Sequence, residues 1–228
     1  TGTNQNDFLF GKGGADTLKG QDGNDAILGD SLDTLIDGGN GSDTLLVNAN
    51  YVQSNDDSLI GVEKVSTILL ANQPNQGFTI DLSGQSEDFE ITAGTMNDTI
   101  TGGAGDDFID GNAGTDTVFY DGLITISSIV DPVTMLSTGF SVSAGAEGID
   151  TLVNVEKVVS GTQTFLLVGN GGYATLQDAI VAADEGDTIV VSAGVVTSGD
   201  LTISKNDLTI LGAQFDTLGS DDSRVNTA

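Results

Sequence analysis

The sequence predicts an all-β fold, a parallel β-solenoid built from nonapeptide repeats, with one short helix near residues 175–183. Three observations support this prediction. Glycine recurs with a nine-residue period, an aliphatic residue follows seven positions after each repeated glycine, and the acids are mostly Asp in glycine-rich turns. Each nonapeptide therefore combines a turn with a minimal strand of period two, and units of this kind stack into a solenoid.

The composition excludes several functions. The 228 residues include 34 acidic and 6 basic side chains, which give a net charge of −28 with no His and no Cys. Nucleic-acid binding requires a basic face, so we expect none. His-dependent triads, Cys nucleophiles, His-ligated zinc and disulfides are also excluded, and we assign no catalytic residue. No apolar run approaches the roughly 18–20 residues of a membrane helix, so we expect no membrane insertion.

The repeats form two blocks. Five nonads run from Gly2 to Leu46, and three more run from Ala93 to Phe119. The aliphatic eighth positions are Leu9, Leu18, Ile27, Ile36, Leu45, Ile100, Ile109 and Val118. Two nonads make one coil, so residues 18 apart lie above one another, about 4.8 Å apart at strand spacing. This places Asp7 over Asp25, Asp25 over Asp43, and Asp98 over Asp116.

Stacked carboxylates repel unless a cation lies between them. Ca²⁺ takes six to eight oxygens in a flexible cage, whereas Mg²⁺ requires a strict octahedron and keeps its waters. The sequence therefore predicts several bound calcium ions. A single Asp-Gly pair is more often an ordinary turn, but eight copies in phase favour calcium. We expect affinities of about 10⁻⁴–10⁻³ M, typical of extracellular modules, and folding that depends on the ion.

The nonads resemble the RTX (repeats-in-toxin) calcium-binding repeat, G-G-x-G-x-D-x-U-x with U aliphatic, which forms a parallel β-roll. The resemblance covers residues 2–46 and 93–119. It implies that the sixth-position Asp supplies carboxylate oxygens and that the turns supply carbonyls. Residue by residue, this implicates Asp7, Asp16, Asp25, Asp43, Asp98, Asp107 and Asp116, with Gly11, Gly13, Gly20, Gly38, Gly102 and Gly111.

Two positions depart from the RTX pattern. Thr34 replaces the sixth-position Asp of the fourth nonad, and Asp33 is an alternative partner for Asp16. Counting 18 residues in either direction from Asp107 gives Phe89 and Thr125, which makes Asp107 half a site at best. Replacing Asp25, which serves two pairs, is therefore expected to cost more calcium and stability than replacing Asp107.

Two spacers follow the repeat blocks. We divide the chain into blocks and spacers at residues 1–47, 48–92, 93–119, 120–167 and 168–228. Leu59–Val65 in the first spacer returns as Leu152–Val158 in the second, and both copies contain V-E-K-V. We expect each copy to form a further β coil in which Val62 and Val65 pack, while Glu63 and Lys64 compensate each other in solvent. The alternative is a catalytic carboxylate pair of Glu63 and Glu156.

The remaining elements follow from local patterns. Residues 78–82 and 140–143 alternate as strands. Residues 175–183 carry apolar side chains at 176, 179, 180 and 183, the spacing of a helix face. Thr175 is the candidate N-cap, and Gly186 is a candidate for the helix end. Strands are expected at 186–191, 200–203 and 207–211.

The C-terminal segment, 168–228, resembles the helix-capped start of a right-handed β-helix of the pectin-lyase-like class. That class includes polysaccharide lyases, hydrolases and epimerases, whose active residues lie on coils beyond the cap. None of these residues can be carried over to this chain. The resemblance therefore implies a fold for the segment and no activity.

The predicted function is that of a non-enzymatic, secreted calcium-binding structural module at the bacterial cell surface, in a surface layer, adhesin or filament. The RTX resemblance implies type I secretion and an extracellular location, where cell-surface polysaccharide is a candidate partner. The alternative is a non-catalytic RTX region of a secreted polysaccharide-active β-helix enzyme. A toxin fragment and a lectin are weaker alternatives, because no membrane-active segment and no Trp are present.

The chain begins at Thr1 without Met and ends at Ala228, which suggests a piece of a larger protein. If both ends are native, we expect the edge near Gly2 of one copy to stack on the C-terminal edge of the next. Such a heterologous contact does not close, so it would build a head-to-tail fibre.

Overall fold

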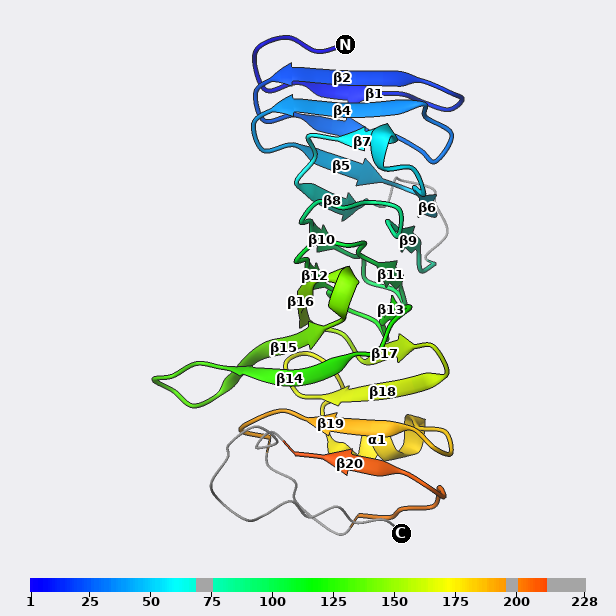
Figure 1. The fold of residues 1–228 in the computed structure, drawn as a ribbon, viewed down its shortest axis with the longest axis vertical. Helices are drawn as coiled ribbons and strands as arrows, with labels where there is room; N and C mark the ends of the chain where they lie inside the picture. Colours follow the sequence, from blue (N-terminus) through cyan, green and yellow to red (C-terminus); the bar gives the residue numbers. More distant parts are fainter. Residues whose placement is uncertain (69–75, 196–200, 213–228) are drawn as a thin grey trace.

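Figure 1 shows the computed structural model of the chain, which describes residues 1–68, 76–195 and 201–212. Short strands stack into a long, narrow solenoid with the N-terminus at one end. The described residues also contain one α-helix, α1 (Leu176–Ala182), and two short 3-10 helices, η1 (Asp56–Ser58) and η2 (Gly145–Glu147). The predicted all-β parallel solenoid with a short helix near 175–183 is confirmed.

One face of the solenoid is a nine-stranded sheet. Its strands, in order across the sheet, are β1 (Phe8–Phe10), β3 (Ala26–Leu28), β5 (Thr44–Val47), β8 (Lys64–Thr67), β10 (Glu90–Thr92), β12 (Phe108–Asp110), β16 (Ile149–Val153), β15 (Ser137–Ser143) and β14 (Thr125–Val130). Neighbouring strands are parallel from β1 to β16, and β15 and β14 then add antiparallel pairs.

Two further sheets complete the solenoid. The three-stranded sheet contains β2 (Thr17–Asp22), β4 (Leu35–Asn40) and β7 (Leu59–Ile60). The eight-stranded sheet contains β6 (Tyr51–Val52), β9 (Thr79–Asp81), β11 (Thr99–Thr101), β13 (Thr117–Tyr120), β17 (Lys157–Ser160), β18 (Gln163–Val168), β19 (Thr188–Val191) and β20 (Thr209–Leu211). All pairs in these sheets are parallel except β17 with β18.

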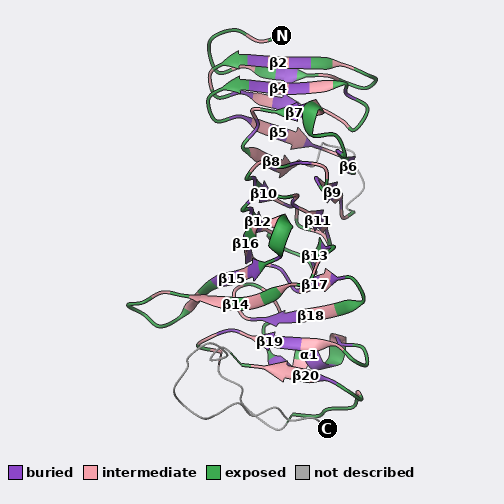
Figure 2. Cartoon of the chain, in the orientation of Figure 1, coloured by how far each residue is buried: buried purple, intermediate pink, exposed green. Residues whose placement is uncertain are grey.

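The strand register confirms the predicted coil of 18 residues within the blocks. Leu9 pairs with Ile27, and Ile27 pairs with Leu45. The eighth-position residues of all eight nonads belong to one apolar cluster, and none is more than 7% exposed. Burial alternates along these strands, as Figure 2 shows for β2 and β4. A column of mostly aliphatic side chains therefore forms the core, which agrees with the low aromatic content.

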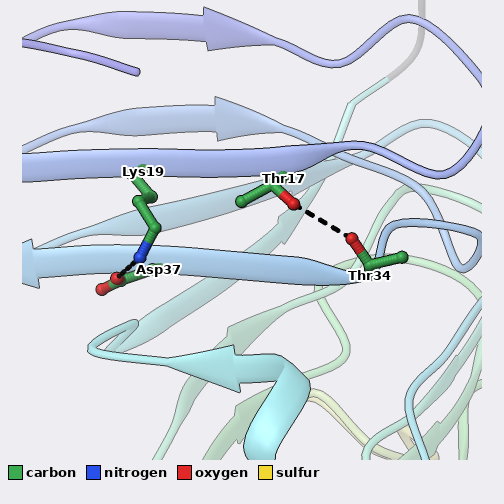
Figure 3. A network of polar contacts seen from close by, with 4 residues as sticks. All are labelled: Thr17, Lys19, Thr34 and Asp37. Carbon is green, nitrogen blue, oxygen red and sulfur yellow. Dashed lines mark hydrogen bonds and ion pairs between the residues drawn. The ribbon is translucent and has the colours of Figure 1, made fainter.

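Polar side chains join successive coils on the outside of the solenoid. Figure 3 shows two such contacts, which join β2 to β4 and to Thr34, the residue just before β4. The hydroxyls of Thr17 and Thr34 lie 3.1 Å apart, and Lys19 Nζ lies 2.8 Å from Asp37 Oδ2. Lys19 is 44% exposed, so this ion pair adds at most about 1 kcal/mol to the free energy of unfolding.

The spacers add features that the nonad period does not predict. Val62 and Val65 are buried as expected, and β8 continues the nine-stranded sheet. The second spacer contains the β14–β15 hairpin, which projects from the stack in Figure 1. The predicted strands at 78–82 and 140–143 are present as β9 and within β15.

The helix and the strands after it surround a second, smaller core. Thr175 Oγ1 accepts the Asp178 amide at 3.1 Å, so the predicted N-cap is confirmed. Ala183, with an extended backbone, is the C-cap, so the predicted role of Gly186 at the helix end is wrong. Gly186 instead lies in the turn before β19, with φ of +87°. Leu176, Ala179 and Ile180 pack in this second cluster.

Two of the three strands predicted after the helix are present, as β19 and β20. Residue 200 lies outside the described residues, and residues 201–203 form no strand, so that prediction is wrong for them. The side chain of Gln177 explains the difference. It accepts the Thr202 amide at 2.9 Å and donates to the Thr202 carbonyl at 3.3 Å, so these backbone groups bond to α1.

Candidate metal centre

The sixth-position Asp residues form a ladder of hydrogen bonds along the solenoid. In each step, the backbone N–H of one Asp donates to Oδ1 of the Asp one coil further along. The N···O distances are 2.7 Å from Asp7 to Asp25, 2.6 Å from Asp25 to Asp43, and 2.7 Å from Asp98 to Asp116. The structure therefore brings together the three pairs that the 18-residue spacing predicts.

The space beside the first position of each nonad is crowded, which explains why glycine is needed there. A Cβ added to Gly20 would overlap with Asp25 Oδ2 and with the carbonyl oxygen of Gly38, one coil further along. A Cβ on Gly2 would lie 2.8 Å from Asp7 Oδ2 and 2.6 Å from the Gly20 carbonyl. A carboxylate oxygen and a carbonyl oxygen thus converge beside each of these glycines. Only a residue without Cβ permits this approach.

Four of the seven sixth-position Asp residues have a carboxylate oxygen without a hydrogen-bond partner. They are Oδ2 of Asp25, Asp43, Asp107 and Asp116, and none of the four residues is more than 2% exposed. Leaving a buried acceptor unsatisfied costs about 1–3 kcal/mol, and more when the group is charged. A cation beside each of these oxygens would satisfy it.

Asp7 and Asp98, two of the remaining sixth-position Asp residues, differ. Asp7 Oδ2 accepts the Thr3 amide at 2.5 Å, and Asp98 Oδ2 accepts the Gly94 amide at 2.8 Å. Backbone donors therefore supply part of what the deeper carboxylates lack.

Burial dominates the electrostatics of the ladder. It raises the pKa of Asp107 and of Asp116 to about 7. It also raises the pKa of Asp43 and of Asp98, with neighbouring carboxylates adding to the rise at Asp43. Without a cation, the charged form of these groups is disfavoured. A divalent cation would reverse this preference, because its charge favours the ionised carboxylates.

The fourth nonad shows how the chain accommodates Thr34. The Asp16 amide donates to Asp33 Oδ1 at 3.2 Å. A Cβ on Gly11 would lie 3.5 Å from Oδ2 of both Asp16 and Asp33. Asp33 therefore supplies the carboxylate beside Asp16, while the Thr34 hydroxyl donates to the Asp16 carbonyl at 2.8 Å.

Of the two neighbours predicted for Asp107, Phe89 is confirmed and Thr125 is wrong. The Phe89 amide donates to Asp107 Oδ1 at 2.7 Å, as the spacing predicts. The Asp107 amide donates to Asp150 Oδ1 at 2.8 Å, so Asp150 takes the place expected for Thr125. Strand β16 pairs with β12 after the hairpin excursion, which brings Asp150 into register although it lies 43 residues away.

The predicted carbonyl glycines do not all take the same place. Gly102 and Gly111, like Gly11, Gly20 and Gly38, lie against the Asp Oδ2 of their own nonad. Gly13 does not, because a Cβ there would meet only Asp30 Oδ2, at 3.8 Å.

The donor set fits calcium better than a metal held by many side chains. Among the described residues, no three acidic side chains converge on one point. A site in these turns must therefore combine one or two carboxylates with backbone carbonyls. This combination of hard oxygen donors in a flexible turn suits Ca²⁺.

A family model for the RTX calcium-binding nonapeptide repeat, in four copies, matches residues 1–33 and 92–122. These segments are RTX calcium-binding repeats. RTX nonapeptide repeats bind calcium ions and are typical of secreted proteins. No curated protein and no solved structure matches the chain, and the resemblance of the C-terminal segment to pectin-lyase-like β-helices stays a prediction.

Sequence reasoning missed a second ladder in the RTX turns. Side-chain oxygens at the fifth position accept the fifth-position amide of the next coil. The distances are 2.8 Å from the Asn24 amide to Asn6, 3.0 Å from the Ser42 amide to Asn24, and 2.9 Å from the Thr115 amide to Asn97. The recurrence of Asn, Ser and Asp at this position is the signal that could have revealed it.

The interpretation of the V-E-K-V segments requires correction. Lys64 forms an ion pair with Glu90 at 2.6 Å, so it does not compensate Glu63. Glu63 Oε2 accepts the Asp43 amide, and Glu156 Oε2 accepts the Asp116 amide, each at 2.7 Å. The two glutamates precede strands of different sheets, β8 and β17, and each holds the amide of a different Asp, so their shared role is structural and they are not paired with each other.

Proposed function

We propose that the chain is a secreted calcium-binding structural module whose stacked RTX turns fold when they bind extracellular calcium. The observation that carries this proposal is the set of four buried Asp oxygens without partners, each beside the first position of its nonad. Calcium is the cation that RTX repeats bind, and it would supply the positive charge that these turns lack.

In this proposal, one carboxylate oxygen positions the neighbouring coil and the other binds the ion. The proposed carboxylate ligands are Asp7, Asp16, Asp25, Asp43, Asp98, Asp107 and Asp116. Carbonyl oxygens of the glycine turns complete the shell, with Gly20 and Gly38 best supported because they converge with a carboxylate oxygen. The aliphatic column supplies the packing, and calcium permits the acidic turns to approach.

Net charge couples this binding to folding. A charge of −28 opposes compaction, and stacking brings the carboxylates within one coil of each other. Ions that bind the folded chain and not the unfolded chain stabilise it by mass action. The chain would therefore remain unfolded where calcium is scarce and fold in millimolar calcium outside the cell.

The finer proposal places the module at the cell surface, as part of a surface layer, adhesin or filament. The long, narrow stack in Figure 1 suits a spacer. RTX repeats are generally non-catalytic, and we assign no reaction to this chain. In the described ranges, no helix has the length and apolar character that crossing a bilayer requires. Head-to-tail self-association and binding to a cell-surface polysaccharide complete the proposal.

Circular dichroism combined with calorimetric titration tests the proposal. Strand content should be low in excess chelator and rise when calcium reaches about 10⁻⁴–10⁻³ M. Magnesium at the same concentration gives the same ionic strength, so it controls for simple screening of the negative charge. Equal strand content in chelator and in calcium, or equal folding in magnesium, would contradict the proposal. Sedimentation of the same samples would reveal any calcium-dependent association.

A further inference from the structure

We infer that Glu63 and Glu156 complete a calcium site at the C-terminal end of each nonad block. Each glutamate belongs to a V-E-K-V segment outside the nonads, and neither lies within the segments that the RTX family model matches. The inference rests on the proposed function, because it requires that the nonads bind calcium.

The end of the first block shows the arrangement. Asp43 is fully buried, its Oδ2 has no partner, and its amide donates to Glu63 Oε2 at 2.7 Å. A Cβ added to Gly38 would lie 2.7 Å from Asp43 Oδ2 and would overlap with the Gly61 carbonyl oxygen. Gly61 thus supplies the carbonyl that Gly38 itself supplies one coil earlier, beside Gly20.

The end of the second block repeats it. Asp116 is fully buried, its Oδ2 has no partner, and its amide donates to Glu156 Oε2 at 2.7 Å. A Cβ on Gly111 would lie 2.9 Å from Asp116 Oδ2 and would overlap with the Asn154 carbonyl oxygen. The carbonyl again comes from the residue two positions before the glutamate.

The two copies share a backbone conformation. Gly61 has φ of +59° and Asn154 has φ of +52°, so both lie in the left-handed region. Glycine enters this region freely, and Asn is among the few other residues that tolerate it. The conformation directs the carbonyl of either residue towards the glycine of the coil before.

The copies lie in different surroundings. The segment with Glu63 leads into β8 of the nine-stranded sheet, and the segment with Glu156 leads into β17 of the eight-stranded sheet. Glu63 is exposed whereas Glu156 is buried. Because the same arrangement occurs on two faces, it follows from the segment itself and not from its neighbours.

These contacts assign a role to each group. One carboxylate oxygen of each glutamate holds the last Asp amide, as Oδ1 does within the nonads. The other oxygen, the unpartnered Asp Oδ2 and the Gly61 or Asn154 carbonyl are the donors that we assign to calcium. Glutamate therefore replaces the missing sixth-position Asp where each block ends.

Glu63→Gln and Glu156→Gln in the full chain test this inference. Glutamine keeps an oxygen that can accept the Asp amide but lacks the charge that binds calcium. Each variant should bind one calcium ion fewer than the wild-type chain at saturation, and the double variant two fewer. Equilibrium dialysis counts the ions, and circular dichroism in calcium checks folding.

Glu147→Gln is the matched control. Glu147 also accepts backbone amides, from Asp121 at 3.1 Å and Gly122 at 3.0 Å, but it lies outside the nonad turns. This variant should bind as many ions as the wild-type chain. If Glu156→Gln fails to fold, the exposed Glu63→Gln decides. A wild-type calcium count in the Gln variants would overturn the inference, whereas a wild-type chain that binds no calcium would overturn the proposed function.

Discussion

Asp25 and Asp107 agree in solvent exposure, in hydrogen bonding and in their position within the nonad. Each is 2% exposed and has a second carboxylate oxygen with no partner. Each accepts an amide from the previous coil at 2.7 Å, and its own amide donates to an Asp of the next coil. Each also lies against the first glycine of its nonad. Burial, hydrogen bonding and sequence motif therefore do not separate the two.

The difference lies in the backbone that faces them. The Gly38 carbonyl converges with Asp25 Oδ2 beside Gly20. At Gly102, the three atoms nearest to an added Cβ all belong to Asp107. The coil after Asp25 is another nonad, whereas the coil after Asp107 returns from a hairpin. We propose that a complete oxygen site needs a carbonyl from the next coil as well as an Asp.

Asp150, which follows Asp107 in the stack of coils, has a hydrogen-bond donor for its second carboxylate oxygen. The Tyr120 hydroxyl donates to Asp150 Oδ2 at 2.6 Å, and both residues are buried. Burial and the nearby Asp150 raise the pKa of Tyr120, so the hydroxyl keeps its proton. A proton donor here takes the role that we propose for calcium in the turns with Asp25 and Asp43.

The largest expected effect is a pH dependence that changes sign with calcium. Burial raises the pKa of Asp107 and of Asp116 from 3.8 to about 7, so the calcium-free folded chain binds more protons than the unfolded chain. Its stability should rise as pH falls from about 7 towards 4. Calcium affinity should fall over the same range, because the ligands must lose their protons. Circular dichroism in chelator, which reports the folded fraction, and calcium titrations at several pH values measure the two trends.

A double variant, Asp107→Asn with Asp116→Asn, is the control for this dependence. The other carboxylates of this variant still bind protons on acidification, but positions 107 and 116 do not. The rise in chelator stability between pH 7 and 5 should therefore be smaller than in the wild-type chain. Stability in chelator that stays level or falls on acidification of the wild-type chain would refute the prediction.

An intermediate effect should separate Asp25 from Asp107 directly. Asp25→Asn should lose one calcium ion, and the loss of a site filled at about 100 times its Kd costs about 2.7 kcal/mol. Asp107→Asn should lose less calcium than Asp25→Asn and should be more stable than the wild-type chain in chelator, because it removes an unpaired buried charge. Ion counting and urea denaturation in calcium measure the first effect, and circular dichroism in chelator reports the folded fraction for the second. Equal losses in the two variants would mean that the next-coil carbonyl is unimportant.

The smallest expected effect concerns Tyr120→Phe. The variant leaves Asp150 Oδ2 buried without its donor, at a cost of about 1–3 kcal/mol. The number of bound calcium ions should not fall, because the hydroxyl contacts Asp150 and none of the proposed ligands. Urea denaturation in calcium measures the cost, with Tyr173→Phe as a control for loss of a tyrosine hydroxyl elsewhere. Unchanged stability of Tyr120→Phe would show that this hydrogen bond is unimportant.

Much of the fold could be predicted because the same nine-residue pattern occurs eight times. The eighth-position residues from Leu9 to Val118 share one phase, so their burial, the strands that carry them and the 18-residue coil follow from the sequence. The pairs of Asp25 with its neighbours follow from the same count. The helix at Leu176–Ala182 could be predicted from its own spacing and cap, which are local signals.

Asp43, Asp107 and Asp116 are each the last sixth-position Asp of their stack within a repeat block. Their partners in the next coil could not be predicted in this way. Asp43 meets Glu63 after 20 residues, Asp116 meets Glu156 after 40, and Asp107 meets Asp150 after 43. No single period contains these separations. Each arises because the chain leaves the coil, forms a loop or hairpin, and returns to the next free strand edge.

The sequence by itself determined the repeating unit, its apolar column and the acidic turns that suit calcium, because each of these is a local pattern repeated at constant spacing. Only the tertiary structure decided which carboxylate and which carbonyl face the last Asp of each stack. The physical reason is that a strand edge pairs with whichever strand lies beside it in space. Lengthening the loop between two strands costs little entropy, so distance along the chain does not fix the partner.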